Sequence, residues 1–327
     1  STRLKVAVLD TTRGGLPTVG RVETLIGEPD VSVFQPQFSP DGRTLAYISD
    51  EGGWGNLWLY DLETAEHRQL TDDPVELARP AWVQGIRTYG FSPGGERIYY
   101  VCNEAGFDRL WVYDLDMGTA QAVQSPLSDY SSLLQISVAP DSGTLAFLAS
   151  SCTAGGRVVT WTPGESSASV WRYASGETVS PSDLAEPRAV HWPSSDGTRV
   201  HGLYYPPTSS LCTGRGLAPA IIAIHGGPTG QSTAGYNARA QFFATRGYAY
   251  LEVNYRGSTG YGKPYMAMLR GQWGVYDVED AVSGARYLVD AGLADGERLV
   301  IMGGSAGGYT VLKSLVDHPG FFKAALC

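Results

Sequence analysis

The residues with the clearest chemical potential are a serine set among small residues, Gly303-Gly304-Ser305-Ala306-Gly307-Gly308-Tyr309. An apolar run at 299–302 leads directly into them, and a helical pattern follows. A strand, a sharp turn and a helix around Gly-x-Ser-x-Gly form a nucleophile elbow, whose strained turn presents the serine hydroxyl at the edge of a sheet. The alternatives are an ordinary glycine-rich turn or a phosphate-binding loop. Because this strand and helix are both present, we predict that Ser305 is a catalytic nucleophile.

A second constellation, His225-Gly226-Gly227-Pro228, follows the apolar run at 220–224. Its glycines expose backbone N–H groups, whereas Pro228 has none. We predict that the N–H groups of Gly227 and Ala306 form an oxyanion hole for the charge that develops during attack by Ser305. His225 precedes the serine and lies in the loop that forms this hole. We therefore interpret it as a residue of the substrate cleft and not as the base.

A third segment, Asn254-Tyr255-Arg256-Gly257-Ser258-Thr259-Gly260-Tyr261-Gly262, follows the next predicted strand. Either Tyr255 or Arg256 lines the cleft, or the segment is a loop packed beneath the site; the sequence leaves both open.

Three acids, Asp277, Glu279 and Asp280, raise the question of a metal site. We favour a helix start, with Asp277 as N-cap and Asp280 in the first turn. We expect neither a metal nor a cofactor.

The sequence does not supply an obvious base for Ser305. In this type of fold the triad follows the order Ser, Asp, His. After Ser305 the candidates are Asp317 and His318. His318 lies 13 positions along the predicted helix, which places it roughly 20 Å away at 1.5 Å per residue. We therefore expect the triad Asp and His to lie outside this chain, and we expect this polypeptide alone to be inactive.

The elements that must position these residues alternate between strand and helix over 181–327. This alternation predicts a mostly parallel sheet covered on both faces. We predict helices at 237–246, 277–290 and 309–317, and a hairpin around 195–197. The second domain is thus expected to be the N-terminal part of an α/β-hydrolase, ending shortly after the nucleophile helix.

The first half, 1–180, contains repeats. The turn Ser39-Pro40-Asp41-Gly42 recurs at 92–95 and more loosely at 139–143, and Leu-Trp-x-Tyr-Asp-Leu occurs at both 57–62 and 110–115. Lys5–Asp10 is a weaker copy, and 170–173 is a candidate fourth. A period of about 50 residues with several strands per unit indicates β-propeller blades, and three units are too few to close a ring. We predict the C-terminal blades of a partial propeller.

Composition excludes several classes of protein. The net charge of −9 argues against nucleic acid as a partner. No run of 18 apolar residues suggests a membrane span, and the first residues lack the apolar core of a signal peptide. The four cysteines show no metal or disulfide spacing, so we expect free thiols in a reducing compartment, the cytoplasm. The sequence leaves open whether the protein is a homo-oligomer.

Four motifs, in this order, resemble those of the prolyl oligopeptidase family: His-Gly-Gly-Pro at 225–228, the segment at 254–262, Trp-Gly with Asp-Val-Glu-Asp at 273–280, and the serine motif at 303–309. The acylaminoacyl-peptidase and dipeptidyl-aminopeptidase-like branch is the most similar. The resemblance implies a serine peptidase that cleaves short or N-acylated peptides through a Ser–Asp–His triad, with a propeller that screens access. It assigns the nucleophile to Ser305 and the oxyanion hole to Gly227 and Ala306.

One departure from the family bears on specificity. Prolyl oligopeptidase itself and the dipeptidyl peptidase IV branch have a tyrosine where His225 stands, so this chain lacks their phenolic oxyanion donor. That argues against strict cleavage after proline. Two other functions fit the same residues: an esterase on this scaffold, and a non-catalytic propeller-based binding protein with a decayed hydrolase domain.

Overall fold

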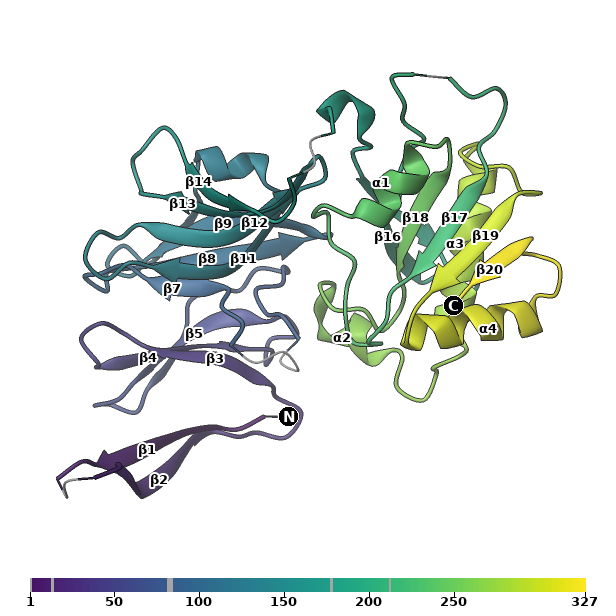
Figure 1. Ribbon diagram of the computed structural model, residues 1–327. Coiled ribbons are helices and arrows are strands. Elements are labelled where there is room, and N and C mark those ends of the chain that lie inside the picture. Colours follow the sequence, from purple (N-terminus) through teal and green to yellow (C-terminus); the bar gives the residue numbers. More distant parts are fainter. Residues whose placement is uncertain (1, 13–14, 81–84, 177–178, 212) are drawn as a thin grey trace.

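The computed structural model describes residues 2–12, 15–80, 85–176, 179–211 and 213–327 (Figure 1). Its first half is built from antiparallel sheets. The strands are β1 (Leu4–Asp10), β2 (Thr18–Ile26), β3 (Val33–Phe38), β4 (Thr44–Ser49), β5 (Asn56–Asp61), β6 (His67–Gln69), β7 (Tyr89–Phe91), β8 (Arg97–Glu104), β9 (Phe107–Asp114), β10 (Thr119–Ala122), β11 (Ser132–Val138), β12 (Leu145–Ser151), β13 (Ala154–Trp161) and β14 (Ser169–Tyr173). A 3-10 turn, η1 (Pro126–Asp129), precedes β11.

Three four-stranded sheets, β3 to β6, β7 to β10 and β11 to β14, confirm the predicted propeller units. The repeated turn joins the first and second strands of each sheet, where Gly42 and Gly95 have positive φ. The Leu-Trp-x-Tyr-Asp repeat forms the third strand, β5 or β9. The candidate fourth copy of this repeat at 170–173 does not hold the same place, because these residues form β14, the last strand of the third sheet.

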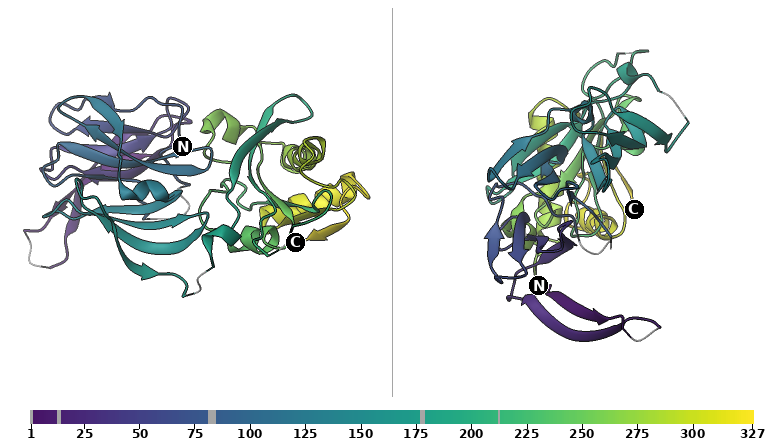
Figure 2. Two further views of the ribbon diagram at one scale, coloured as in Figure 1. Left: turned by 90° about the horizontal axis from the view of Figure 1, so that it is seen from above. Right: turned by 90° about the vertical axis from the view of Figure 1, so that its left-hand side faces the viewer.

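The sheets pack face to face. Alternate residues of neighbouring blades interlock in two apolar clusters, one centred on Ile48 and Ile98 and the other on Val101 and Phe147. β1 and β2 form a two-stranded hairpin that projects from the end of this stack (Figure 2). Its apolar side chains Val8 and Val19 are exposed.

The second half contains a six-stranded sheet in the order β15-β16-β18-β17-β19-β20. Its strands are β15 (Arg188–Pro193), β16 (Arg199–Tyr205), β17 (Ala220–Ile224), β18 (Ala249–Asn254), β19 (Leu299–Gly303) and β20 (Ala324–Leu326). β15, β16 and β18 pair antiparallel, and β18, β17, β19 and β20 pair parallel. The predicted boundary at 180 falls between β14 and β15, beside the 3-10 turn η2 (Pro181–Asp183). Residues 177–178, just before this boundary, lie outside the described residues.

Helices cover both faces of this sheet, as predicted (Figures 1 and 2). They are α1 (Ala238–Ala244), α2 (Gly262–Ala267), α3 (Tyr276–Asp290) and α4 (Ala306–Asp317). Successive strand residues point to opposite faces. Ile221 and Tyr250 therefore pack with α1, whereas Ile222 and Leu251 pack with α3 and α4. No helix within the described ranges is long and apolar enough to cross a membrane.

Hydrogen bonds join the two halves directly. Gln231 donates to the side chain of Asn103 on β8 at 2.9 Å, and Gln241 on α1 donates to the Cys152 carbonyl at 2.9 Å. The α2 backbone N–H of Lys263 donates to the Gly53 carbonyl at 2.7 Å. These bonds place the propeller loops against the carboxyl edge of the parallel strands, where ligands bind in open α/β sheets.

Candidate active site

The site is built on the turn between β19 and α4. Ser305 has φ 56° and ψ −124°, a left-handed backbone conformation that costs energy for a residue with a Cβ. The helix begins at the next residue, Ala306, so the serine stands at its N-terminal end, and its side chain is exposed. The predicted helix starting at 309 therefore begins three residues earlier. This geometry presents the hydroxyl to solvent at the edge of the sheet.

Glycines allow the close packing that this turn requires. A Cβ on Gly307 would lie 2.3 Å from the carbonyl oxygen of Ile224, and one on Gly303 would lie 2.6 Å from that of Gly307. A Cβ on Gly226 would come within 3.3 Å of the Ser305 Cβ. α4 therefore lies directly against the end of β17, and the loop after β17 lies against Ser305.

The two backbone amides predicted for an oxyanion hole are brought to this place. Ile224 pairs with Gly303, so the loops after β17 and β19 leave the same edge of the sheet. Gly227 is exposed with φ 134°, and Ala306 is the first residue of α4. Among the described residues, neither amide has a protein acceptor. The positive end of the α4 dipole adds to the attraction for an anion.

His225 lies in this loop with both ring nitrogens engaged. Nδ1 is 2.8 Å from the Gly226 carbonyl, which can only accept, so Nδ1 carries a proton. Burial lowers the pKa of His225 to about 4, so the ring is neutral. Nε2 lies 2.8 Å from the Ser258 hydroxyl oxygen, which also lies 2.7 Å from the Tyr255 carbonyl, so the single hydroxyl proton serves one of these two acceptors. The ring also stacks on Tyr255 with centroids 4.4 Å apart. These contacts leave neither nitrogen available as a base for Ser305.

Tyr255 and Arg256 are each 1% exposed, so they support the loop and do not line an open cleft. The Tyr255 hydroxyl lies 3.2 Å from the His225 carbonyl and 3.3 Å from that of Pro228, so its one proton holds the loop from beneath. The Arg256 guanidinium is surrounded by acids, as described next. The burial of both side chains agrees with the alternative in which this segment is a loop packed beneath the site.

Arg256 is the centre of a buried charge network. Its Nε lies 3.0 Å from Asp280 Oδ1, and its NH1 and NH2 bond Asp196 at 2.7 Å and Glu279 at 2.9 Å. Asp280 is fully buried, which raises its pKa, while hydrogen bonds from Arg256 oppose that rise. The network ties the hairpin β15–β16 and helix α3 to the segment after β18.

The prediction of Asp277 as an N-cap is wrong. α3 begins at Tyr276, and Val275 occupies the cap position. The Asp277 carboxylate instead accepts from the Gly274 N–H at 2.6 Å and from the Thr310 hydroxyl on α4. It thereby fixes the nucleophile helix to α3. Within the described part of the chain, no group of three or more His, Cys, Asp or Glu side chains could hold a metal ion.

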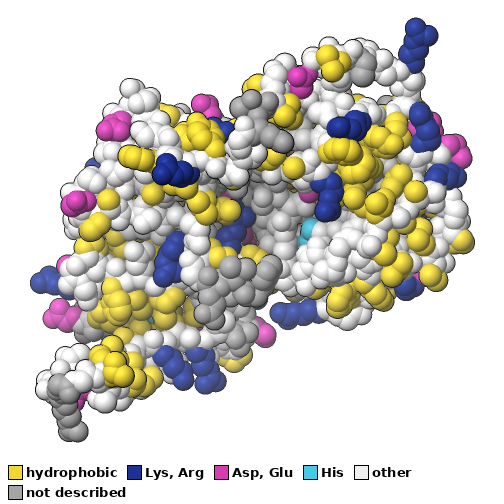
Figure 3. All heavy atoms as spheres, in the orientation of Figure 1, with side chains coloured by type: hydrophobic (Ala, Val, Ile, Leu, Met, Phe, Trp, Pro, Cys, Tyr) yellow, Lys and Arg dark blue, Asp and Glu magenta, His cyan; other side chains and the backbone are white. Residues whose placement is uncertain are grey.

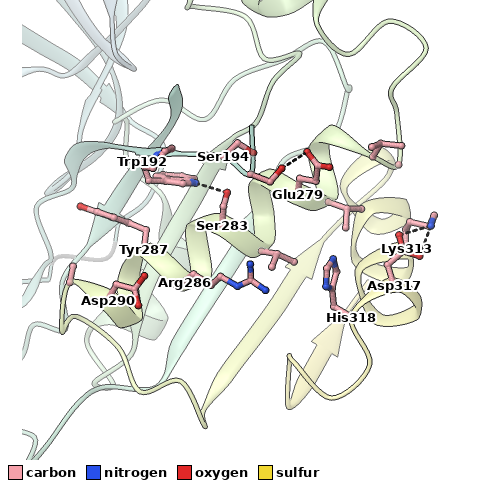
Figure 4. Close-up of a pocket in the computed structure, with 17 residues that line it drawn as sticks. Trp192, Ser194, Glu279, Ser283, Arg286, Tyr287, Asp290, Lys313, Asp317 and His318 are labelled. Atoms are coloured by element: carbon pink, nitrogen blue, oxygen red, sulfur yellow. Dashed lines mark hydrogen bonds and ion pairs between the residues drawn. The ribbon is translucent and has the colours of Figure 1, made fainter. Parts of the chain in front are cut away.

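His318 lies at the other end of α4 from Ser305. It lines a separate groove of about 620 Å³ between α3, α4 and β15, into which Arg286 and His318 both point (Figure 4). The helix length of roughly 18–20 Å separates it from the serine.

Cys102, Cys152 and Cys327 are free thiols, and Cys212 lies outside the described residues.

Sequence reasoning missed two groups near the site. The Ser258 hydroxyl bonds His225, and Thr310 bonds Asp277 across two helices. Residue type and sequence spacing do not predict these partners, because each pair comes together only when the domain folds. Figure 3 shows a hollow between the two halves of the molecule.

The fold defines the class of protein: an α/β-hydrolase domain joined to β-propeller blades. Residues 234–327 match the model of the prolyl oligopeptidase family. The structure is similar to a Mycobacterium tuberculosis puromycin-hydrolyzing peptidase, with 32% identity, a TM-score of 0.89, and coverage of 99% of this chain and 48% of that one. The match of residues 234–327 and the likeness of the whole chain to this peptidase relate the protein to the prolyl oligopeptidase family.

Two curated relatives support this assignment. A dipeptidyl aminopeptidase BIII of Pseudoxanthomonas mexicana is 33% identical over 43% of this chain and 22% of its own length. An acylamino-acid-releasing enzyme 1 of Oryza sativa subsp. japonica is 36% identical over 33% of this chain and 14% of its own length. The chain thus matches less than a quarter of either relative, and about half of the solved peptidase.

Proposed function

We propose that the complete protein is a serine peptidase that hydrolyses short or N-acylated peptides through an acyl-enzyme at Ser305. The observation that carries the proposal is the exposed serine on a strained turn, with the N–H groups of Gly227 and Ala306 beside it. The triad Asp and His are supplied by residues outside this chain. The peptidase relatives support peptides as substrates.

The chemistry follows from this arrangement. Ser305 Oγ attacks the scissile carbonyl carbon and gives its proton to the triad His, and the carbonyl oxygen becomes an oxyanion between the two amides. The intermediate collapses, the C–N bond breaks, and the His returns the proton to the leaving amine. Water then attacks the acyl-enzyme by the same route and releases the acid. The glycines on either side of Ser305 keep the amides in place throughout.

The test is covalent labelling of the complete protein with a fluorophosphonate, followed by peptide mapping. We expect one adduct, at Ser305, and loss of labelling in Ser305→Ala. The matched control is Ser128→Ala, an exposed serine on the propeller, which should label as well as wild type. A correctly folded wild-type protein that resists labelling would contradict the proposal and favour a non-catalytic role.

An esterase on this scaffold uses the same serine and amides. Turnover of an amino-acid anilide and of the corresponding ester decides between the two. A peptidase cleaves both, whereas activity on the ester alone would refute peptide hydrolysis.

A further inference from the structure

The groove that contains His318 lies entirely within the hydrolase half, between the end of β15, one side of α3 and the last two turns of α4 (Figure 4). Its volume of about 620 Å³ is that of a small-molecule site, which usually measures roughly 300–1,000 Å³. The residues that line it do not include the loops at 225–228 and 303–306. The groove is therefore separate from the proposed active site, and the peptidase chemistry does not explain it.

One side of the groove is apolar and firmly packed. Trp192 is buried, and its ring stacks on the ring of Tyr287 with centroids 5.7 Å apart. The indole N–H donates to the Ser283 hydroxyl at 3.0 Å, so the buried ring leaves no donor unsatisfied. Val278 and Val282, one turn apart on α3, continue this wall and are also buried. An apolar group placed against these side chains gains contact area that is removed from water.

Arg286 enters the groove from α3 without an acidic partner. Its guanidinium carbon lies 5.6 Å from the centre of the Phe321 ring, which is a cation–π contact. Across the described parts of the chain, this guanidinium forms neither an ion pair nor a hydrogen bond with a protein group. Its planar fork of N–H donors is therefore available to a bound acceptor.

His318 faces Arg286 from the other wall (Figure 4). It directly follows α4, and its backbone N–H donates to the Ser314 carbonyl at 3.0 Å, which holds it against the end of the helix. Its ring meets the Phe321 ring with centroids 6.4 Å apart. Neither ring nitrogen bonds any residue that the structure describes. Phe321 contacts both side chains and packs on the core of the sheet, so it fixes the two donors relative to each other.

The acids that line the groove do not neutralise Arg286. Glu279 bonds Arg256 at 2.9 Å, and Asp317 forms an ion pair within α4 at 2.5 Å. Asp290 lies one turn after Arg286 on α3, yet Figure 4 shows the guanidinium extending toward the His318 side and not toward this acid. One positive charge therefore stands without a partner beside the apolar wall.

We propose that this groove is a second binding site, for a ligand that joins one carboxylate to an apolar body. The Arg286 guanidinium holds the carboxylate through two parallel N–H···O bonds, and the His318 ring donates a third. The apolar body lies against Trp192 and the two valines. A dianion such as phosphate fits less well, because three acids line the same groove. The chemistry is shared by the carboxyl terminus of a short peptide and by a free aryl-alkyl carboxylic acid.

A ligand in this position connects two helices. Arg286 belongs to α3, and His318 ends the helix that Ser305 begins. The bound carboxylate therefore restrains the far end of the nucleophile helix. The site itself does not depend on catalysis at Ser305, so its tests stand apart from those of the peptidase.

The first test is calorimetry on the complete protein with two acids, N-acetylphenylalanine and 4-phenylbutyrate, and with the neutral amide of each. We expect an acid to bind at least tenfold more tightly than its amide, because only the acid forms charge-assisted bonds. The acid that binds more tightly identifies the source of the carboxylate. Binding of neither acid, equal binding of acid and amide, or tighter binding of inorganic phosphate would overturn the inference.

Variants locate the charge. Arg286→Gln should weaken binding of the acid at least tenfold and leave binding of the amide within threefold. Arg286→Lys should lie in between, because it keeps the charge but loses the planar fork. Arg270→Gln, an exposed arginine between α2 and α3 that does not line the groove, is the matched control and should change neither. An unchanged affinity in Arg286→Gln would refute the assignment.

The second test measures hydrogen exchange of the complete protein with and without the acid. We expect the backbone amides at 313–318 to exchange at least threefold more slowly in the complex, while those of α1, on the other face of the sheet, stay unchanged. Slower exchange confined to 225–228 would place the ligand at the proposed active site and contradict the inference. Failure of Ser305 labelling with Arg286-dependent binding intact would refute the peptidase and leave this site standing.

Discussion

Gly307→Ala tests whether the contact between α4 and β17 sets the position of the nucleophile. The added Cβ would stand 2.3 Å from the Ile224 carbonyl oxygen and 2.8 Å from that of His225. Ordinary C···O contacts lie near 3.3 Å or beyond, so α4 must move by about 1 Å relative to the loop. Both colliding atoms belong to backbone, so no side chain can rotate away. The amide of Ala306 and the hydroxyl of Ser305 move with the helix.

The magnitude follows from that displacement. A misplacement of about 1 Å costs about 100-fold in rate. Overpacking costs about 1–3 kcal/mol, and the better helix propensity of alanine returns up to about 1 kcal/mol. We therefore expect kcat/KM of the complete protein to fall about 100-fold while the free energy of unfolding falls by no more than about 2 kcal/mol. Anilide turnover and urea denaturation measure the two quantities.

Gly308→Ala is the matched control in the same helical turn. A Cβ there would lie 3.6 Å from the Gly303 carbonyl oxygen and 3.7 Å from the Cys327 Cβ, both ordinary contacts. It gains the same helix propensity without the collision, so activity should stay within threefold and stability should not fall. Wild-type turnover in Gly307→Ala, or equal losses in both variants, would refute the reasoning.

Two further predictions concern buried charges. Arg256→Met should lower the free energy of unfolding in urea by about 3–5 kcal/mol, because it leaves Asp280 buried and unpaired, while KM changes less than twofold. Adding Asp280→Asn should restore part of the lost stability. A large change in KM would instead argue that Arg256 touches substrate. Glu76→Gln should stabilise the protein at pH 8 but much less at pH 5. The pKa of Glu76 in the folded protein, about 7, exceeds its ordinary value of 4.5. The wild type therefore loses stability as the pH rises through 7, by up to about 3 kcal/mol. A stability difference between the two proteins that does not depend on pH would contradict this.

The elbow was predictable from sequence because its constraints are local. Glycines on either side of Ser305 and an apolar run before it specify a tight strand-to-helix turn by themselves. The blades were predictable because their turns repeat. The last strands of the first two blades, β6 and β10, were missed, because they are only 3 and 4 residues long and have few apolar side chains to alternate.

The buried charges could not be placed from sequence. Arg256 and Asp280 are 24 positions apart and meet only when α3 packs on the sheet. An acid near a helix start suggests a cap, yet Asp277 faces the neighbouring helix, and this choice depends on packing. Glu76 lies in a loop without periodicity, and one of the two backbone N–H groups that bond its carboxylate comes from Gly55, 21 residues earlier. Charge in a sequence does not reveal burial.

Because Arg256 and Asp280 form a buried network, the presence of these motif residues indicates a stable fold and does not by itself indicate catalysis. Arg256 and Asp280 hold the hydrolase fold together whether or not Ser305 reacts. A lineage that lost catalysis but kept the domain for binding would still be selected to retain them, because either change alone would cost about 3–5 kcal/mol of stability. Among diverging copies, retention of Arg256 and Asp280 would therefore show that the fold is kept and would not by itself show that catalysis is kept.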